Sequence, residues 1–79
     1  MLPDCQLFGT LGCHLCEQAE SLLLPWVARG LQVELIDIAD SEQHLQAYAL
    51  LIPVLRRNDS AAELRWPFDA AQLAAWLAA

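Results

Sequence analysis

The sequence predicts an α/β fold, a four-stranded mixed sheet flanked by helices in the element order β-α-β-α-β-β-α. Three observations predict it. Short apolar stretches that alternate as strands do are separated by stretches whose apolar residues recur at helical spacing. A strand, a helix of about 15 residues and a second strand form a crossover unit, and such units are parallel and right-handed in nearly all known proteins. The 79 residues suffice for one domain, which we expect to span residues 1–79.

The first strand and helix come early in the chain. "CQLF" at 5–8 is an apolar run that Gly9 and Gly12 bracket too closely for a helix, so we expect a buried strand there. The helix that follows is predicted by apolar residues at the i, i+4, i+7, i+8 and i+11 positions of one face, which are Leu15, Ala19, Leu22, Leu23 and Trp26. Pro25 lacks a backbone N–H and is expected to kink or end this helix near Leu24.

Alternation, capping residues and turn chemistry predict the remaining elements. Apolar and β-branched residues alternate with charged ones in the strands, and side-chain caps precede both later helices. The turn sequence "NDS" separates the last two strands, which should pair as an antiparallel hairpin. In chain order we expect a strand at 31–40, a helix at 42–51 capped by Asp40 or Ser41, a strand at 53–57 opened by Pro53, a strand at 62–66 and a helix at 70–79 capped by Asp69.

Charge and hydropathy exclude several classes of function. The formal net charge is −6, with four arginines and no lysine, so no basic stripe can neutralise nucleic-acid phosphates. Pro25 and Arg29 interrupt the longest apolar stretches well short of the roughly 20 residues that a membrane helix needs. The first residues show neither the basic start nor the long apolar stretch of a secretory signal. We therefore expect a monomeric cytoplasmic protein that binds neither nucleic acid nor membrane.

The segment "GTLGCHLCEQAE" places Cys13 and Cys16 where a glycine-containing turn becomes a helix. In a reducing compartment a close cysteine pair is more often catalytic or metal-binding than a structural disulfide. Unpaired N–H groups and the positive end of the helix dipole favour an anion at the first helical turn, and the thiolate is the form of cysteine that attacks disulfides. Cys16 lies close enough to close a small ring with Cys13. The pattern therefore favours a redox pair.

The chain resembles the glutaredoxin branch of the thioredoxin fold over essentially its whole length. The resemblance rests on a C-x-x-C at the first strand-to-helix turn, a proline that opens a later strand, and a closing hairpin and helix. It implies a thiol–disulfide oxidoreductase in which Cys13 is the nucleophile and Cys16 is the resolving thiol. It also implies a cis peptide bond between Ile52 and Pro53, so that the backbone of Ile52 pairs with an extended substrate segment.

The same resemblance implies the partners of the pair. No resident cofactor or metal is expected, and the partners would be disulfide-containing proteins or glutathione, with glutathione or a thioredoxin-type reductase supplying electrons. C-H-L-C replaces the family's usual C-P-Y-C, and Pro67 stands where the family has a glycine pair whose backbone N–H groups bind a glutathione carboxylate. Substrate contacts are expected from Thr10, Gly12, His14, Leu15, Ile52, Pro53, Phe68 and Asp69.

Several alternatives remain open on the sequence alone. The thiols could be packing groups, or the domain could be a binding module without turnover. C-x-x-C is also half of many zinc sites, for which His14 and either Cys5 or His44 would complete the ligands, and an iron–sulfur cluster bridging two copies is a further option. Against metal, Cys5 is better explained as a buried apolar residue, and His44 as a solvated one. His14 either adds positive charge beside Cys13 or faces solvent without effect.

Overall fold

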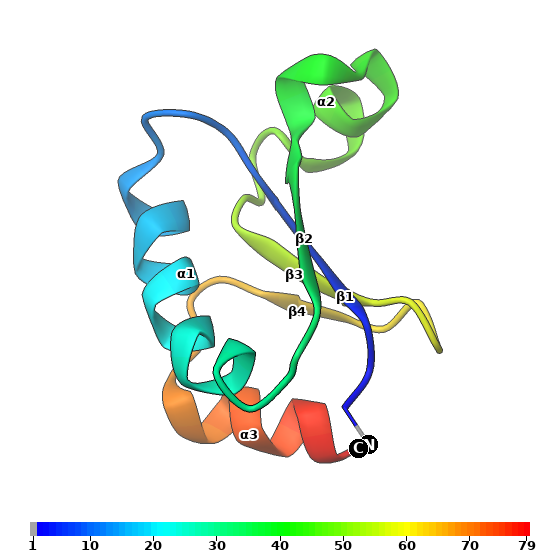
Figure 1. Ribbon diagram of the computed structural model, residues 1–79. Coiled ribbons are helices and arrows are strands. Elements are labelled where there is room, and N and C mark those ends of the chain that lie inside the picture. Colours follow the sequence, from blue (N-terminus) through cyan, green and yellow to red (C-terminus); the bar gives the residue numbers. More distant parts are fainter. Residues whose placement is uncertain (1) are drawn as a thin grey trace.

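The computed structural model describes residues 2–79 and confirms the predicted fold class and element order. Four strands form one sheet in the order β2-β1-β3-β4 (Figure 1). Among the helices of residues 2–79, none has both the length and the hydropathy of a membrane-spanning segment. The strands are β1 (Cys5–Gly9), β2 (Val33–Asp37), β3 (Val54–Arg57) and β4 (Glu63–Arg65), and the helices are α1 (His14–Val27), η1 (Ile38–Asp40, a 3-10 turn), α2 (Glu42–Tyr48) and α3 (Ala70–Ala78).

β1 lies inside the sheet and joins its parallel and antiparallel parts. It runs parallel to β2, with Leu7 opposite Leu35, and antiparallel to β3, with Leu7 opposite Leu55. The β1-α1-β2 crossover is therefore parallel, as predicted. β3 and β4 form the predicted antiparallel hairpin. Because Phe8 lies opposite Val54, the end of β1 and the start of β3 meet at the same end of the sheet.

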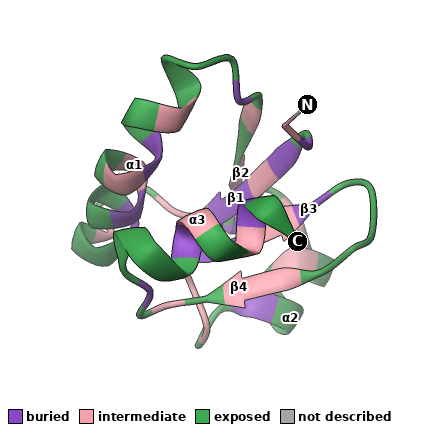
Figure 2. Ribbon diagram, turned by 90° about the horizontal axis from the view of Figure 1, so that it is seen from below, coloured by how far each residue is buried: buried purple, intermediate pink, exposed green. Residues whose placement is uncertain are grey.

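Helices cover both faces of the sheet, and each face has its own core (Figure 2). Successive residues of a strand point to opposite faces, so Leu7 enters the core against α1 and α3, whereas Phe8 enters the core against α2. The larger core contains Cys5, Leu7, Ala19, Leu23, Leu31, Leu55, Phe68, Leu73 and Leu77, and the smaller core contains Phe8, Ile38, Tyr48 and Val54.

α1 is longer than the sequence predicts, because it continues past Leu24 with Pro25 inside it. Pro25 removes only the one hydrogen bond that its N–H would donate to the carbonyl of Ser21, on the exposed side of the helix. The last turn still forms, since the Ala28 N–H donates to the Leu24 carbonyl at 3.0 Å. Trp26, one residue after the proline, packs against the larger core. Tertiary packing therefore extends the helix beyond its local stop signal.

α2 is shorter than predicted and ends at Tyr48. The N–H groups of Leu51 and Ile52 both donate to the Tyr48 carbonyl, at 2.8 and 3.1 Å, which turns the chain toward β3. The Tyr48 ring stacks on Phe8 with centroids 4.3 Å apart, and the His44 ring meets Phe8 edge-on at 5.2 Å. The expectation of a solvated His44 is therefore wrong, because this contact half-buries the imidazole.

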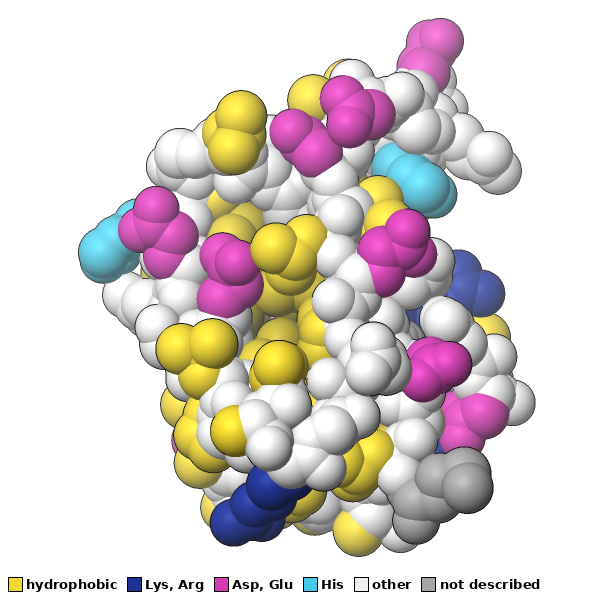
Figure 3. Space-filling view, in the orientation of Figure 1, with side chains coloured by type: hydrophobic (Ala, Val, Ile, Leu, Met, Phe, Trp, Pro, Cys, Tyr) yellow, Lys and Arg dark blue, Asp and Glu magenta, His cyan; other side chains and the backbone are white. Residues whose placement is uncertain are grey.

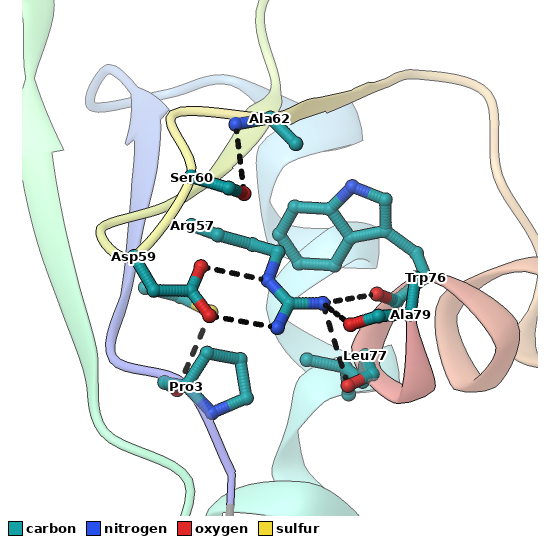
Figure 4. Close-up of polar contacts among 9 residues, drawn as sticks. Pro3, Arg57, Asp59, Ser60, Ala62, Trp76, Leu77 and Ala79 are labelled. Carbon is teal, nitrogen blue, oxygen red and sulfur yellow. Dashed lines mark hydrogen bonds and ion pairs between the residues drawn. The ribbon is translucent and has the colours of Figure 1, made fainter.

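Arg57, at the end of β3, holds the carboxyl end of α3 against the sheet (Figure 4). Its Nη1 donates to the carbonyls of Trp76 and Ala79 at 2.7 and 2.9 Å, which belong to the helix end, where carbonyls lack intrahelical partners. Its Nε and Nη2 donate to the two carboxylate oxygens of Asp59 at 3.0 and 2.9 Å. The hydrogen bonds from Arg57 lower the pKa of the Asp59 carboxyl. The last helix thus depends on one buried guanidinium and its carboxylate partner.

We expect the Arg57–Asp59 pair to make the stability of the fold depend on acid pH. Because the folded-state pKa of Asp59 lies below its ordinary value, the stabilisation is complete above the pKa of an unfolded aspartate, about 3.9, and is lost as the pH falls through the folded value. Asp59→Asn should lower the urea midpoint of unfolding at neutral pH and flatten its decline in acid. The exposed Asp40 provides the matched control, Asp40→Asn, and equal effects of the two substitutions would contradict the prediction.

Candidate active site

Cys13 and Cys16 form a disulfide at the start of α1, in the turn that follows β1. Their Cα atoms lie 5.2 Å apart, within the usual range for a bridged pair. Cys13 is the N-cap of the helix, with an extended backbone and an Sγ that accepts a hydrogen bond from the Cys16 N–H at 3.1 Å. Cys13 is half-buried, whereas Cys16 is only 5% exposed. The first sulfur is therefore the accessible one, and the second is shielded.

Gly9 makes room for Cys16 at the end of β1. A Cβ atom at this position would lie 3.0 Å from Cys16 Sγ and 3.3 Å from Cys16 Cβ, which is tighter than ordinary van der Waals contact. Gly12 is glycine for a different reason, since its φ is +75° and a Cβ there would meet no atom within 4 Å. In the sequence Gly9 marks only the end of a strand, so its packing role emerges from the structure.

Thr10 and Asp37 tie the turn before Cys13 to the end of β2. The Thr10 hydroxyl donates to Asp37 Oδ1 at 3.0 Å, and the same oxygen accepts the Ala39 N–H at 3.0 Å. Asp37 thereby caps η1, and the strand predicted over 31–40 is shorter than expected. No local pattern marks Asp37 as part of the site, because Thr10 lies 27 residues earlier in the chain.

His14, Leu15 and Leu11 all lie within two residues of Cys13 and are exposed to solvent. The His14 side chain is 80% exposed, and its Nδ1 lies 3.7 Å from Glu17 Oε2, so a protonated imidazole would pair with that carboxylate. Leu15 is 45% exposed and Leu11 is 91% exposed. Leu11 is absent from the predicted contacts, yet with Leu15 it gives the surroundings of Cys13 an apolar character.

Pro53 lies at the same end of the sheet as the cysteine turn, because β1 and β3 pair antiparallel and the end of one meets the start of the other. The Ile52–Pro53 peptide bond is cis, as the resemblance implies. Pro53 is buried and Ile52 is half-buried, and the Pro53 carbonyl accepts the Trp66 N–H at 3.2 Å. The Trp66–Pro67 peptide bond is also cis, a feature that the sequence analysis does not predict.

Phe68 and Asp69, expected among the substrate contacts, have structural roles. Phe68 is 5% exposed in the larger core, and its ring meets Trp66 edge-on with centroids 5.1 Å apart. This burial leaves little of the Phe68 ring accessible, and its contact with substrate stays a prediction. Asp69 is the predicted cap of α3: its Oδ1 accepts the Gln72 N–H at 2.7 Å, and its own N–H donates to Gln72 Oε1 at 2.9 Å.

The other side chains considered as metal ligands lie away from the cysteine pair. Cys5 is buried in the larger core, where desolvation raises the pKa of its thiol to about 11. His44 packs against Phe8 on the opposite face of the sheet. Within residues 2–79, no group of three or more His, Cys, Asp or Glu side chains is placed to hold a metal ion.

A cysteine pair at the start of the first helix, on a mixed sheet of this order, defines the chain as a protein of the thioredoxin-like class. The sequence model of one family within that class, the Glutaredoxin-like domain (DUF836), matches residues 4–78. The chain therefore belongs to this glutaredoxin-like family. No curated protein matches the chain.

Solved structures similar to this chain have the same fold over nearly the whole length. The crystal structure of the Northeast Structural Genomics target protein XcR50 from X. campestris is 40% identical, with a TM-score of 0.84 over 95% of this chain and 96% of that one. Its solution structure has a TM-score of 0.81 over 95% and 92% of the two chains. Protein Ne2328 from Nitrosomonas europaea is 26% identical, with a TM-score of 0.80 over 98% and 93%.

Proposed function

We propose that this chain is a thiol–disulfide oxidoreductase in which Cys13 is the nucleophile and Cys16 is the resolving thiol. The observation that carries the proposal is the unequal environment of two bonded sulfurs. Cys13 is half-buried and caps a helix, while Cys16 is 5% exposed. A pure packing pair has no need of an accessible sulfur at a helix end. Disulfide exchange needs one sulfur that a substrate can reach and a second that reaches the first.

The proposed reaction balances as two exchange steps. The Cys13 thiolate attacks one sulfur of a substrate disulfide, displaces the other sulfur as a thiolate, and leaves a mixed disulfide. Cys16 then loses its proton to solvent or to the departing thiolate and attacks Cys13 Sγ, which releases the second substrate sulfur. The substrate gains two electrons while the Cys13–Cys16 bond forms, and an external thiol reductant must reduce that bond before the next cycle.

The amino end of α1 is the main source of stabilisation for the attacking thiolate. The Cys16 N–H already points at Cys13 Sγ at 3.1 Å, and the helix dipole places roughly half a positive charge at this end. His14 contributes less, because its imidazolium would lie 3.7 Å from the Glu17 carboxylate, which compensates its charge. The position of Cys13 at the helix end, more than the identity of its neighbour, therefore supports its role as the nucleophile.

The surroundings of α3 and of the cysteine turn favour protein disulfides over glutathione as the substrate. Pro67 has no N–H, and the Asp69 N–H donates to Gln72 Oε1 at 2.9 Å, so two backbone donors are unavailable to a glutathione carboxylate. The exposed Leu11 and Leu15 instead offer apolar contact to a polypeptide segment. We infer that a protein reductant, of the thioredoxin-type reductase class, regenerates the dithiol more readily than glutathione.

Turnover with alternative reductants tests this proposal. The purified chain is mixed with a disulfide-bonded peptide and supplied with a thioredoxin-type reductase, with glutathione, or with dithiothreitol, and peptide thiols are counted over time. We expect turnover with dithiothreitol and with the reductase, and a slower rate with glutathione. If no reductant supports turnover although the disulfide is reduced, the chain is a binding module that keeps the fold without the activity, and the proposal is wrong.

A further inference from the structure

β2 is an edge strand whose outer backbone groups have no partner among residues 2–79. It pairs only with β1. The Cys5 N–H donates to the Gln32 carbonyl at 2.9 Å, and alternate residues face the neighbouring strand in a parallel ladder, so Glu34 and Ile36 also face β1. The intervening Leu35 therefore turns its N–H and carbonyl away from the sheet. Such an edge is a template on which another extended chain can pair.

An apolar groove of about 190 Å³ lies beside this edge, between β2 and α1. Leu35 pairs with Leu7 across the sheet and shares its face, yet Leu35 is 61% exposed. Cys16 also lines the groove, so the groove reaches the shielded side of the disulfide. Figure 3 shows apolar side chains at the surface between α1 and β2, with acidic side chains on either side. An apolar side chain from a partner strand would cover Leu35 and fill the groove.

The charges beside the groove define the chemistry of its partner. Glu20 on α1 and Asp37 at the end of β2 line the groove, and no arginine is among the lining residues. The whole chain carries a formal net charge of −6. A second copy would bring the same net negative charge to this edge, and like charges repel. A strand that carries lysine or arginine is therefore favoured over a second copy.

We propose that the edge of β2 binds an extended basic segment of another protein, which adds a strand to the sheet. An apolar side chain of that segment would enter the groove beside Leu35. Lysines or arginines two residues before and after it share its face and would face Glu20 and Asp37. Because backbone pairing and charge provide the binding and no sulfur takes part, the interaction is independent of the proposed redox activity. It would place the partner next to the cysteine pair in either oxidation state.

Peptide titration of the full chain tests the proposal. The probe is a short synthetic peptide of the pattern Lys-Thr-Val-Thr-Lys, in which valine and both lysines share one face of an extended strand, and its control has glutamate in place of each lysine. We expect the lysine peptide to protect the Leu35 amide from hydrogen exchange, while the amides of Glu34 and Ile36, already bonded to β1, change little. Binding should weaken as salt is raised, because the exposed charges are screened. The proposal is overturned if both peptides bind equally or if the Leu35 amide stays unprotected.

Substitutions distinguish backbone pairing at the β2 edge from non-specific binding of the peptide. Leu35→Pro removes an outward N–H and no ladder bond, and should weaken peptide binding about two- to tenfold, the effect of one backbone hydrogen bond. Leu35→Ser and Glu20→Lys should also weaken it, while Leu45→Ser, on α2 over the opposite face, should not. If Leu35→Pro fails to fold, N-methylation of the central peptide residue makes the same test from the other partner. Dimerisation through β2 in sedimentation would make a second copy the occupant and overturn the proposal.

Discussion

Cys13→Ser is expected to lower the rate of disulfide reduction about a thousandfold or more, the scale of loss when a covalent nucleophile is removed. A serine hydroxyl does not ionise near neutral pH and cannot attack a disulfide as the thiolate does. Cys16→Ser should behave differently, because it keeps the accessible nucleophile and loses only the thiol that releases the product. We expect this variant to accumulate a mixed disulfide on Cys13, which nonreducing mass spectrometry would detect as an adduct of the substrate.

The buried Cys5 provides a control for this pair of variants. Burial raises the pKa of its thiol to about 11, so it stays protonated at neutral pH, and it lies in the larger core away from the turn. Cys5→Ala should therefore reduce the substrate at the rate of the unaltered chain. An adduct on Cys16 in the Cys13→Ser variant would show that Cys16 is the nucleophile. The absence of an adduct on Cys13 in the Cys16→Ser variant would contradict the proposed mechanism.

Gly9→Ala is the second substitution with a large expected effect. The added Cβ would lie 3.0 Å from Cys16 Sγ, so the Cys16 side chain must shift by a few tenths of an ångström within a packed site. We expect the free energy of unfolding to fall by about 1 to 3 kcal/mol, as for other overpacked sites. Formation of the intramolecular disulfide should also slow, because Cys16 is displaced from its position beside Cys13. Urea unfolding and the rate of reoxidation measure the two effects separately.

A double-mutant cycle with Cys16→Ala tests the cause of the Gly9 effect. If the clash with the sulfur is responsible, Gly9→Ala should cost less stability in the Cys16→Ala background than in the unaltered chain, since the sulfur is then absent. All four proteins of the cycle are measured under reducing conditions, so that loss of the Cys13–Cys16 disulfide does not enter the comparison. Equal costs in the two backgrounds would show that Gly9 serves the backbone of β1 instead of the packing of Cys16.

The types and order of the elements were predictable because they depend on residues close together in the chain. The apolar spacing from Leu15 to Trp26 indicates α1, and Asp69 marks the start of α3, where the structure confirms a capping box. Element ends were less predictable. α1 continues past Pro25 because Trp26 packs on the larger core. α2 ends at Tyr48, where the Leu51 and Ile52 N–H groups both donate hydrogen bonds to the Tyr48 carbonyl.

Some features of the candidate site were likewise predictable from the sequence, and others were not. The sequence places Cys13 and Cys16 at a helix start, and the structure bears this out with a disulfide there and Cys13 as the N-cap. The bond between Thr10 and Asp37 joins residues that are 27 apart, and no local pattern indicates it. The sequence around Phe68 is equally consistent with a surface residue and with a core residue, and only the tertiary packing places Phe68 in the larger core.

By itself, then, the sequence determined the β-α-β-α-β-β-α order, the cysteine pair and its position at a helix start, since chain neighbours and backbone geometry are sufficient for these. The packing of the sheet and helices makes Cys16 the shielded sulfur, sets Gly9 tightly against it, and leaves β2 as a free edge beside the apolar groove that Glu20 and Asp37 also line. The physical reason is that burial and hydrogen-bond partners depend on segments which the sheet brings together from distant parts of the chain.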